Sequence, residues 1–343
     1  MRAQLQRHSP SAAALLVAAL VSLPASPLEA KQRVIKLGTV APEGTLPHLA
    51  LKQMAQVFAE ETGGKVQLKI YPGVVGDEPT IVRKMRIGQL QGAMLTSKGL
   101  ATISPEPMAV QLPMLFADTA EIDAVFAAMQ PTFDRALTED GFVPIAWCDG
   151  GWMYLFSARP AVALDDLGGR RMWMWPHDEG AVLSFVALGL EPVVLSDIDI
   201  VPSLRTGLVE VFPATPVTAM ALQTYRDTPH MIEVPLAYML GGVVISADAW
   251  ESIAPPARER ILRRCAKIGE QLSADVRRDS AEAIEIMQRK GLTVHRPTSA
   301  QREEWRAAAI RARATAIGVS VDAALFERVL AERERYRARA RRR

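Results

Sequence analysis

The feature that most constrains the fold is an uninterrupted helical pattern over residues 255–290, which opens with prolines suited to a first helical turn. At the usual rise per residue, such a helix extends for roughly 50 Å. This length exceeds the width of one small domain. We therefore expect the helix to brace two lobes at once.

Upstream of this helix, short apolar segments alternate with segments of helical periodicity. The strand-like segments lie at 34–38, 66–71, 93–96, 142–147, 153–156, 172–175, 192–195, 209–212 and 241–246. The helical segments lie at 48–62, 78–87, 181–188 and 198–206. This order is typical of α/β domains with mostly parallel sheets. It predicts two α/β lobes with crossing strands and a cleft between them.

The N-terminus indicates export. A basic start precedes an apolar run over residues 11–23, and Ala30 is a small residue suited to cleavage. This pattern predicts a signal peptide over residues 1–30, too short to span a membrane and without a following cysteine for lipid attachment. We expect a soluble exported protein that begins near Lys31.

The formal net charge of the chain is +2, of which the signal peptide contributes +1 and the last twelve residues +5, so the remainder carries about −4. Basic character is thus confined to the tail, which argues against a nucleic-acid groove. A final Arg-rich amphipathic helix is expected from near Ser299. The arginine-rich last twelve residues are expected to form a solvated, frayed helix end. Contact with anionic lipid or a partner protein is the alternative.

Motifs for catalysis are absent from the sequence, including GxSxG, HExxH, the P-loop and GxGxxG. The cluster His177-Asp178-Glu179 is better explained as the acidic first turn of a helix than as a metal site. Cys148 and Cys265 permit a disulfide in an oxidising compartment without establishing one. We therefore expect no catalytic residues, no metal and no cofactor.

Four segments carry a family resemblance, at residues 71–100, 111–116, 151–176 and 204–216. In this order they resemble the periplasmic solute-binding subunits of tripartite ATP-independent periplasmic (TRAP) transporters, of the dicarboxylate-binding type. The resemblance implies hinge closure around a small-molecule solute. It also implies integral membrane permease subunits as partners, with a helper periplasmic protein as a further candidate.

The resemblance and the strand pattern together predict the domain boundaries. Lobe I comprises 31–152 with 241–280, lobe II comprises 153–240 with 281–320, and 321–343 forms the C-terminal Arg-rich helix or tail.

Where the family pattern reads GFRHLTN and, twenty residues later, GKKIRVP, two arginines hold the ligand's carboxylate. In this chain Met153 and Trp173 occupy those two positions with the same spacing. Neither side chain forms a charge-assisted hydrogen bond. Arg171 is the alternative clamp, although a surface charge explains it more simply.

Four of the six tryptophans lie between residues 147 and 175, at the crossover where the chain passes between the two expected lobes. This concentration predicts a ligand bound by apolar contact rather than by a carboxylate clamp, and core packing is the alternative. Strand alternation places Trp173 and Trp175 on one face. The remaining candidates lie at strand ends or helix starts, where capping or the helix dipole also explains several of them. The candidate ligand-binding residues are Trp147, Trp152, Met153, Tyr154, Trp173, Trp175, Phe212, Thr215, Thr96, Ser97, Glu78 and Asp197.

The sequence thus predicts a periplasmic solute-binding protein that delivers a small apolar or aromatic-bearing molecule to a TRAP-type permease. One alternative is a receptor for a small organic acid, held by Arg171 or by backbone N–H groups. Another is a sensor subunit that presents its ligand to a receptor. An exported enzyme is disfavoured because no nucleophile–base pair is found.

Overall fold

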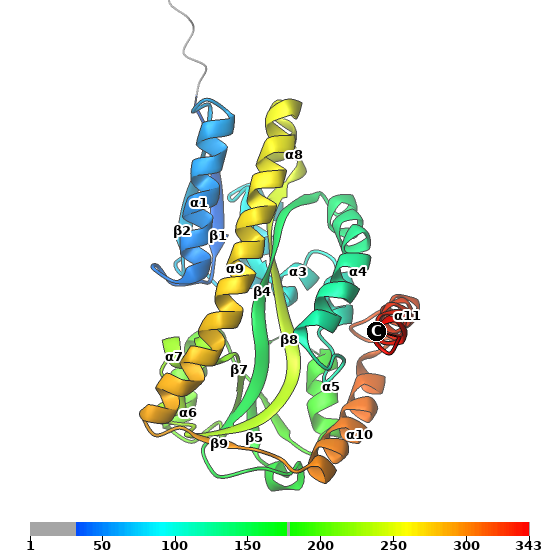
Figure 1. Ribbon diagram of the computed structural model, residues 1–343. Helices are drawn as coiled ribbons and strands as arrows, with labels where there is room; N and C mark the ends of the chain where they lie inside the picture. Colours follow the sequence, from blue (N-terminus) through cyan, green and yellow to red (C-terminus); the bar gives the residue numbers. More distant parts are fainter. Residues whose placement is uncertain (1–31, 177–178, 343) are drawn as a thin grey trace, which may run out of the picture. The chain divides into compact units, whose positions relative to one another are not determined.

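The computed structural model describes residues 32–176 and 179–342. The predicted signal peptide and the residues His177 and Asp178 lie outside the described residues. Residues 32 onward fold around a nine-stranded sheet with the order β2-β1-β3-β8-β4-β7-β5-β6, and β9 pairs with β8 (Figure 1).

Strands and helices alternate along most of the described chain. The strands are β1 (Arg33–Thr39), β2 (Val66–Pro72), β3 (Gly92–Thr96), β4 (Phe142–Ser157), β5 (Arg171–Met174), β6 (Glu191–Val194), β7 (Val211–Ala214), β8 (His230–Ser246) and β9 (Thr293–His295). The α-helices are α1 (Leu46–Glu61), α2 (Glu78–Arg86), α3 (Ser97–Ala101), α4 (Thr119–Glu139), α5 (Glu179–Ala187), α6 (Ile200–Arg205), α7 (Pro216–Ala221), α8 (Ala247–Glu251), α9 (Pro255–Arg289), α10 (Ser299–Ala316) and α11 (Ala323–Ala340). Short 3-10 turns are η1 (Glu106–Val110), η2 (Asp165–Leu167), η3 (Asp197–Asp199) and η4 (Thr224–Arg226).

The sheet is parallel within two outer groups and antiparallel at its centre. Strand β1 runs parallel to β2 and β3, and β5 runs parallel to β6 and β7. The long strands β8 and β4 pair antiparallel with each other and with the groups on either side. The prediction of mostly parallel sheets therefore holds inside each group and fails where the long strands cross.

The two central strands are longer than the sequence pattern predicts. Segments 142–147 and 153–156 form one strand, β4, and β8 begins at His230 rather than at residue 241. Gly150 and Gly151, a pair typical of turns, lie at a bulge where the pairing with β8 shifts register. The φ of Gly151 is +93°, which favours glycine. Helix α4 was not predicted.

The long helix α9 confirms the expected bridge, and it follows the length of the β4–β8 pair (Figure 1). Its packing on β4 depends on Gly269. A Cβ at this position would lie 2.2 Å from the Trp147 carbonyl oxygen, so a side chain here would push the helix away from the strand.

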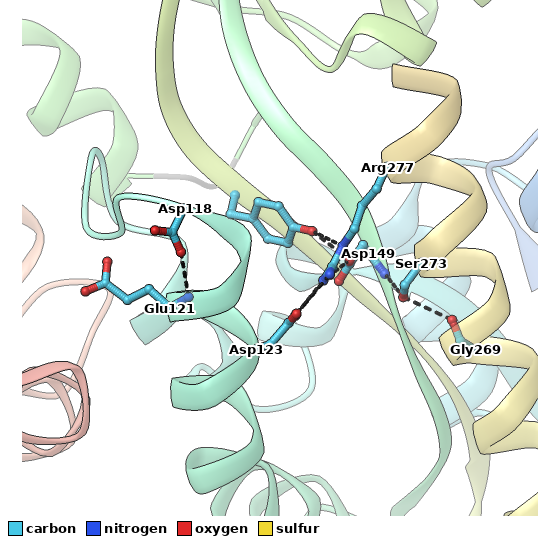
Figure 2. A network of polar contacts seen from close by, with 8 residues as sticks. Asp118, Glu121, Asp123, Asp149, Gly269, Ser273 and Arg277 are labelled. Carbon is cyan, nitrogen blue, oxygen red and sulfur yellow. Dashed lines mark hydrogen bonds and ion pairs between the residues drawn. The ribbon is translucent and has the colours of Figure 1, made fainter. Parts of the chain in front are cut away.

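A polar network fixes α9 to the central strands (Figure 2). Arg277 of α9 donates from Nε to Asp149 Oδ2 at 2.6 Å and reaches Asp123 of α4 through both terminal nitrogens. Tyr238 of β8 donates to the same Asp149 oxygen at 2.6 Å. Burial raises the pKa of Asp149, and the bonds from Tyr238 and Arg277 oppose this shift.

The C-terminal segment forms two helices rather than one frayed end. Helix α10 begins at Ser299 as expected, with Thr298 as its cap, but it ends at Ala316, and α11 follows. Helix α11 packs beside α4 and buries Leu325, Phe326 and Val329. The last twelve residues are half-exposed or exposed where the structure describes them, as expected of a solvated end, but Arg333 and Arg337 bind the Leu115 carbonyl and Glu121.

Cys148 and Cys265 are both free and buried, so they form no disulfide. Burial raises the pKa of each thiol to about 12. Within residues 32–176 and 179–342, no helix is both long and apolar enough to cross a membrane.

Candidate ligand site

The first part of the site lies where β3 ends and α2 begins. Glu78, in the first turn of α2, accepts from the Thr96 backbone N–H at 2.6 Å and from the Thr96 hydroxyl at 2.7 Å. Burial raises the pKa of the Glu78 carboxyl, and the two bonds from Thr96 oppose this shift. A Cβ at Gly99 would lie 2.6 Å from the Glu78 carboxyl carbon, so this close approach depends on glycine.

Glu78 lines a small polar cavity that joins two distant stretches of the chain. The cavity measures about 20 Å³ and brings Glu78 and Lys98 together with Trp175 and Asp197. Lys98 Nζ lies 5.2 Å from the centre of the Trp175 ring, within cation–π range. Burial raises the pKa of Asp197, while a hydrogen bond from the Trp175 side chain opposes this shift.

Trp175 also lines a second, mostly apolar cavity of about 70 Å³. Met153 of β4 lines this cavity, and Gln111 places an amide in its wall. The Gln111 Oε1 atom is buried and has no hydrogen-bond partner among the described residues. The full lining is Met108, Gln111, Leu112, Pro113, Met153, Met174, Trp175, Gly180, Ala181, Ser184, Phe185, Pro213, Leu236, Ala237, Ala316, Ser320 and Val321.

Trp173 supports Trp175 rather than lining either of these cavities. The two rings lie 4.3 Å apart, which agrees with the predicted shared face. Trp173 is fully buried, and its ring also packs edge-on against Phe212 at 5.6 Å. Trp173 and Phe212 are therefore core residues, and Tyr154 packs against the same cluster.

The other two tryptophans of the crossover belong to a different part of the core. Trp147 packs against Phe126 of α4 and donates from Nε1 to Asp134 at 2.7 Å. Trp152 packs edge-on against Tyr238 at 4.9 Å. Strand β7 lies between β4 and β5, so the expected single cluster of tryptophans around one ligand does not form.

The remaining predicted residues separate into cavity and capping positions. Thr215 caps α7 by accepting from the Thr218 backbone N–H, and it lines neither cavity. Ser97 is fully buried, and its hydroxyl has no partner in the described part of the chain. Asp197 opens the 3-10 turn η3 and lies in the polar cavity.

Arg171 does not act as a clamp in this geometry. It is exposed, donates to the carbonyls of Leu208 and Gly207 at 2.8 Å, and pairs with Glu210. Arg170 is buried and donates to Ser157 Oγ at 2.6 Å. Among the described residues, neither cavity is lined by an arginine.

Sequence reasoning missed Lys98 and Gln111. Lys98 directly follows the predicted residues Thr96 and Ser97, at the strand end where open α/β folds bind their ligands. This position at a strand end could have identified Lys98 as a candidate from the sequence. Gln111 lay inside a resembling segment, but no spacing rule places its amide beside Met153.

A much larger hollow lies elsewhere, in a groove of about 940 Å³ between α4, β4 and α9. Its buried polar groups already pair with each other: Arg277 with Asp149, and Trp147 with Asp134. The described residues contain no group of three side chains suited to a metal ion. We therefore place the candidate site at the two cavities that share Trp175.

Comparison with known proteins decides the family. The family model for bacterial extracellular solute-binding protein, family 7 (DctP), matches residues 37–316. The chain belongs to this family. This confirms the expected TRAP-type solute-binding subunit and agrees with the crossing strands and bridging helix described above.

Individual DctP-family relatives are distant. The protein YiiZ of Salmonella typhimurium is 27% identical over 166 residues, which span 47% of this chain and half of that protein's length. The 2,3-diketo-L-gulonate-binding periplasmic protein YiaO of Escherichia coli is 22% identical over 82% of this chain and 86% of its own. A TRAP periplasmic solute-binding protein from Ralstonia eutropha, solved with bound (S)-2-acetolactate, is 20% identical. It has a TM-score of 0.81 over 88% of this chain and 99% of its own. At that identity, the likeness shows the two-lobe fold.

Proposed function

We propose that this chain is an exported receptor that captures a small organic acid and delivers it to the membrane permease subunits of a TRAP transporter. Family membership supports the solute-binding and transport role. The relative named for 2,3-diketo-L-gulonate and the structure solved with acetolactate both favour a carboxylate ligand. They favour it over the neutral apolar molecule that the sequence pattern predicts.

The observation that carries the proposal is the position of Lys98 beside Trp175. Met153 and Trp173 replace the family's arginines, and Lys98 is the cationic side chain among the described residues that line the two cavities. Lys98 lies in the polar cavity, which shares the Trp175 wall with the apolar cavity. An ammonium group has three N–H donors, so it can bind a ligand carboxylate alongside its neighbours in the protein.

The apolar cavity supports a ligand whose remaining atoms are largely apolar. Met153, Met174 and Phe185 form its walls together with Trp175. Each Å² of apolar surface buried here contributes about 25 cal/mol. The Gln111 amide oxygen accepts a hydrogen bond from a hydroxyl or N–H group of the ligand. The favoured ligand is thus a small monocarboxylate with a compact apolar body.

Isothermal titration of the mature protein against a panel of small acids, including 2-acetolactate, pyruvate, succinate and benzoate, tests the proposal. For an acid that binds, Lys98→Met should weaken binding by about 10- to 100-fold, the range for one charge-assisted hydrogen bond. Arg171→Met is the matched control and should leave affinity unchanged. Undiminished binding by Lys98→Met, or loss of binding by Arg171→Met, would contradict the proposal.

A further inference from the structure

We infer that the turn between α10 and α11 is a movable wall of the ligand cavity, and that α11 holds this wall closed. Ala316, Ser320 and Val321 line the apolar cavity opposite residues of β4 and β5. The inference rests on the proposed function only in identifying this cavity as the ligand site.

The turn sits directly on the start of α5. Ser320 Oγ accepts from the Gly180 backbone N–H at 2.9 Å. A Cβ at Gly180 would lie 2.2 Å from Ser320 Oγ and 3.4 Å from Ala316 Cβ. The absence of a side chain at Gly180 therefore lets the turn close this side of the cavity.

The turn is internally braced, so it moves as a unit. The Gly318 N–H donates to the Val321 carbonyl at 2.8 Å, and the Ser320 N–H donates to the Ala316 carbonyl at 2.9 Å. Gly318 has φ +81°, a conformation that favours glycine. The position of the turn is consequently set by the two helices that flank it.

Helix α10 holds one end of the turn against α5, the helix that follows β5. Ser184 of α5 donates to the Ala312 carbonyl at 3.0 Å, and Trp305 Nε1 donates to the Val162 carbonyl at 3.2 Å. These contacts hold α10 beside α5 independently of α11.

Helix α11 ties the other end to α4 through an ion pair whose carboxylate is buried and whose guanidinium is partly exposed. Arg337 Nε donates to Glu121 Oε1 at 2.5 Å, and the Glu121 side chain is only 2% exposed. Arg333 adds a bond to the Leu115 carbonyl at 3.0 Å. Glu121 also accepts from the Ala117 backbone N–H at 2.7 Å, so the ion pair adds to the apolar contacts of Leu325, Phe326 and Val329 in keeping α11 docked.

Neither Arg337 nor Glu121 lines the cavity, so Arg337 is a positioning residue. When α11 leaves α4, the turn loses its support on that side, and the wall formed by Ser320 and Val321 is free to open. Access to the cavity therefore depends on a contact made outside it.

The experiment measures access to the cavity without any ligand. A Met153→Cys reporter places a thiol in the cavity wall, and neutral iodoacetamide labels it at a rate that tracks local opening. The native Cys148 and Cys265 are buried and their thiol pKa values are raised to about 12, so both label slowly. Cys265 is fully buried in the core and reports global unfolding. Mass spectrometry assigns the label to each cysteine.

Ser320→Ala and Arg337→Gln are each introduced into the reporter. Both should accelerate labelling of the thiol at position 153 by about fivefold or more, as expected when one hydrogen bond that keeps the cavity closed is lost. Arg335→Gln is the matched control, because Arg335 lies on the same helix, is exposed and pairs with Glu332. It should leave the rate unchanged.

Unchanged labelling in both variants would overturn the inference, and so would equal acceleration at all three cysteines, which signals global unfolding. If Arg337→Gln alone unfolds the protein, Glu121→Gln/Arg337→Gln removes the unpaired charge and should still accelerate labelling at position 153 alone. A failed acid titration leaves this result standing, since no ligand takes part.

Discussion

At the residue scale, the neighbouring tryptophans Trp173 and Trp175 have different roles. Strand alternation predicts that they share a face, and they do. It does not reveal which of the two reaches the cavity, because that depends on Phe212, which comes from another strand and encloses Trp173. The cavity role of Trp175 likewise depends on Lys98, which local sequence patterns do not connect to it.

These roles predict that alanine substitution affects mainly stability at Trp173 and mainly ligand affinity at Trp175. Trp173→Ala should lower the free energy of unfolding by about 3 kcal/mol or more, because it empties a core position. Trp175→Ala, at a half-buried residue, should cost less stability and remove most of the affinity for the acid. Urea unfolding and titration of each variant measure both quantities. A Trp173→Ala variant of normal stability that no longer binds would reverse the assignment.

At the element scale, the sequence predicts the long helix α9 better than it predicts where strands join. The pattern of α9 was clear because its apolar spacing continues without a break from Pro255. The pattern predicts two strands where the structure has the single strand β4, because Gly150 and Gly151 are typical of turns and only pairing with β8 places them in a bulge. The sequence predicts a helix or tail over 321–343 but not its docking on α4, because its partner Glu121 is distant in sequence.

The network that joins α9 to β4 gives an element-scale prediction. Arg277→Met leaves the buried Asp149 carboxylate without its cation and should cost about 3 kcal/mol of stability near neutral pH. Asp149 already has a raised pKa in the folded state, and losing Arg277 raises it further. The protonated Asp149 carboxyl is neutral and needs no cation. The stability lost by Arg277→Met should therefore be small well below pH 4 and should grow as the pH rises through the pKa of Asp149 in the folded protein.

Urea unfolding of Arg277→Met across this pH range checks the prediction. Arg278→Met is the control, because Arg278 is exposed and pairs only with Asp275 and Asp279 at the surface. A deficit for Arg277→Met that stays constant with pH would show that Asp149 is not the group left unpaired.

At the scale of the whole molecule, the predicted two-lobe α/β architecture is confirmed, and the lobe boundaries stay predictions. The long bridging helix and the crossing strands β4 and β8 made this architecture predictable. The candidate site was only partly predictable, because it joins residues from α2, α3, β4, β5 and the C-terminal turn. Such a junction depends on how the strand groups are placed, which no local pattern encodes.

The central claim is that a small organic acid binds against Trp175 with its carboxylate at Lys98. Native mass spectrometry of the protein purified from a periplasmic extract tests it most directly, by weighing any retained molecule and fragmenting it for identification. We predict a small carboxylic acid that is retained by the wild type and by Arg171→Met and is lost from Lys98→Met. A neutral apolar molecule, retained equally by Lys98→Met, would contradict the account.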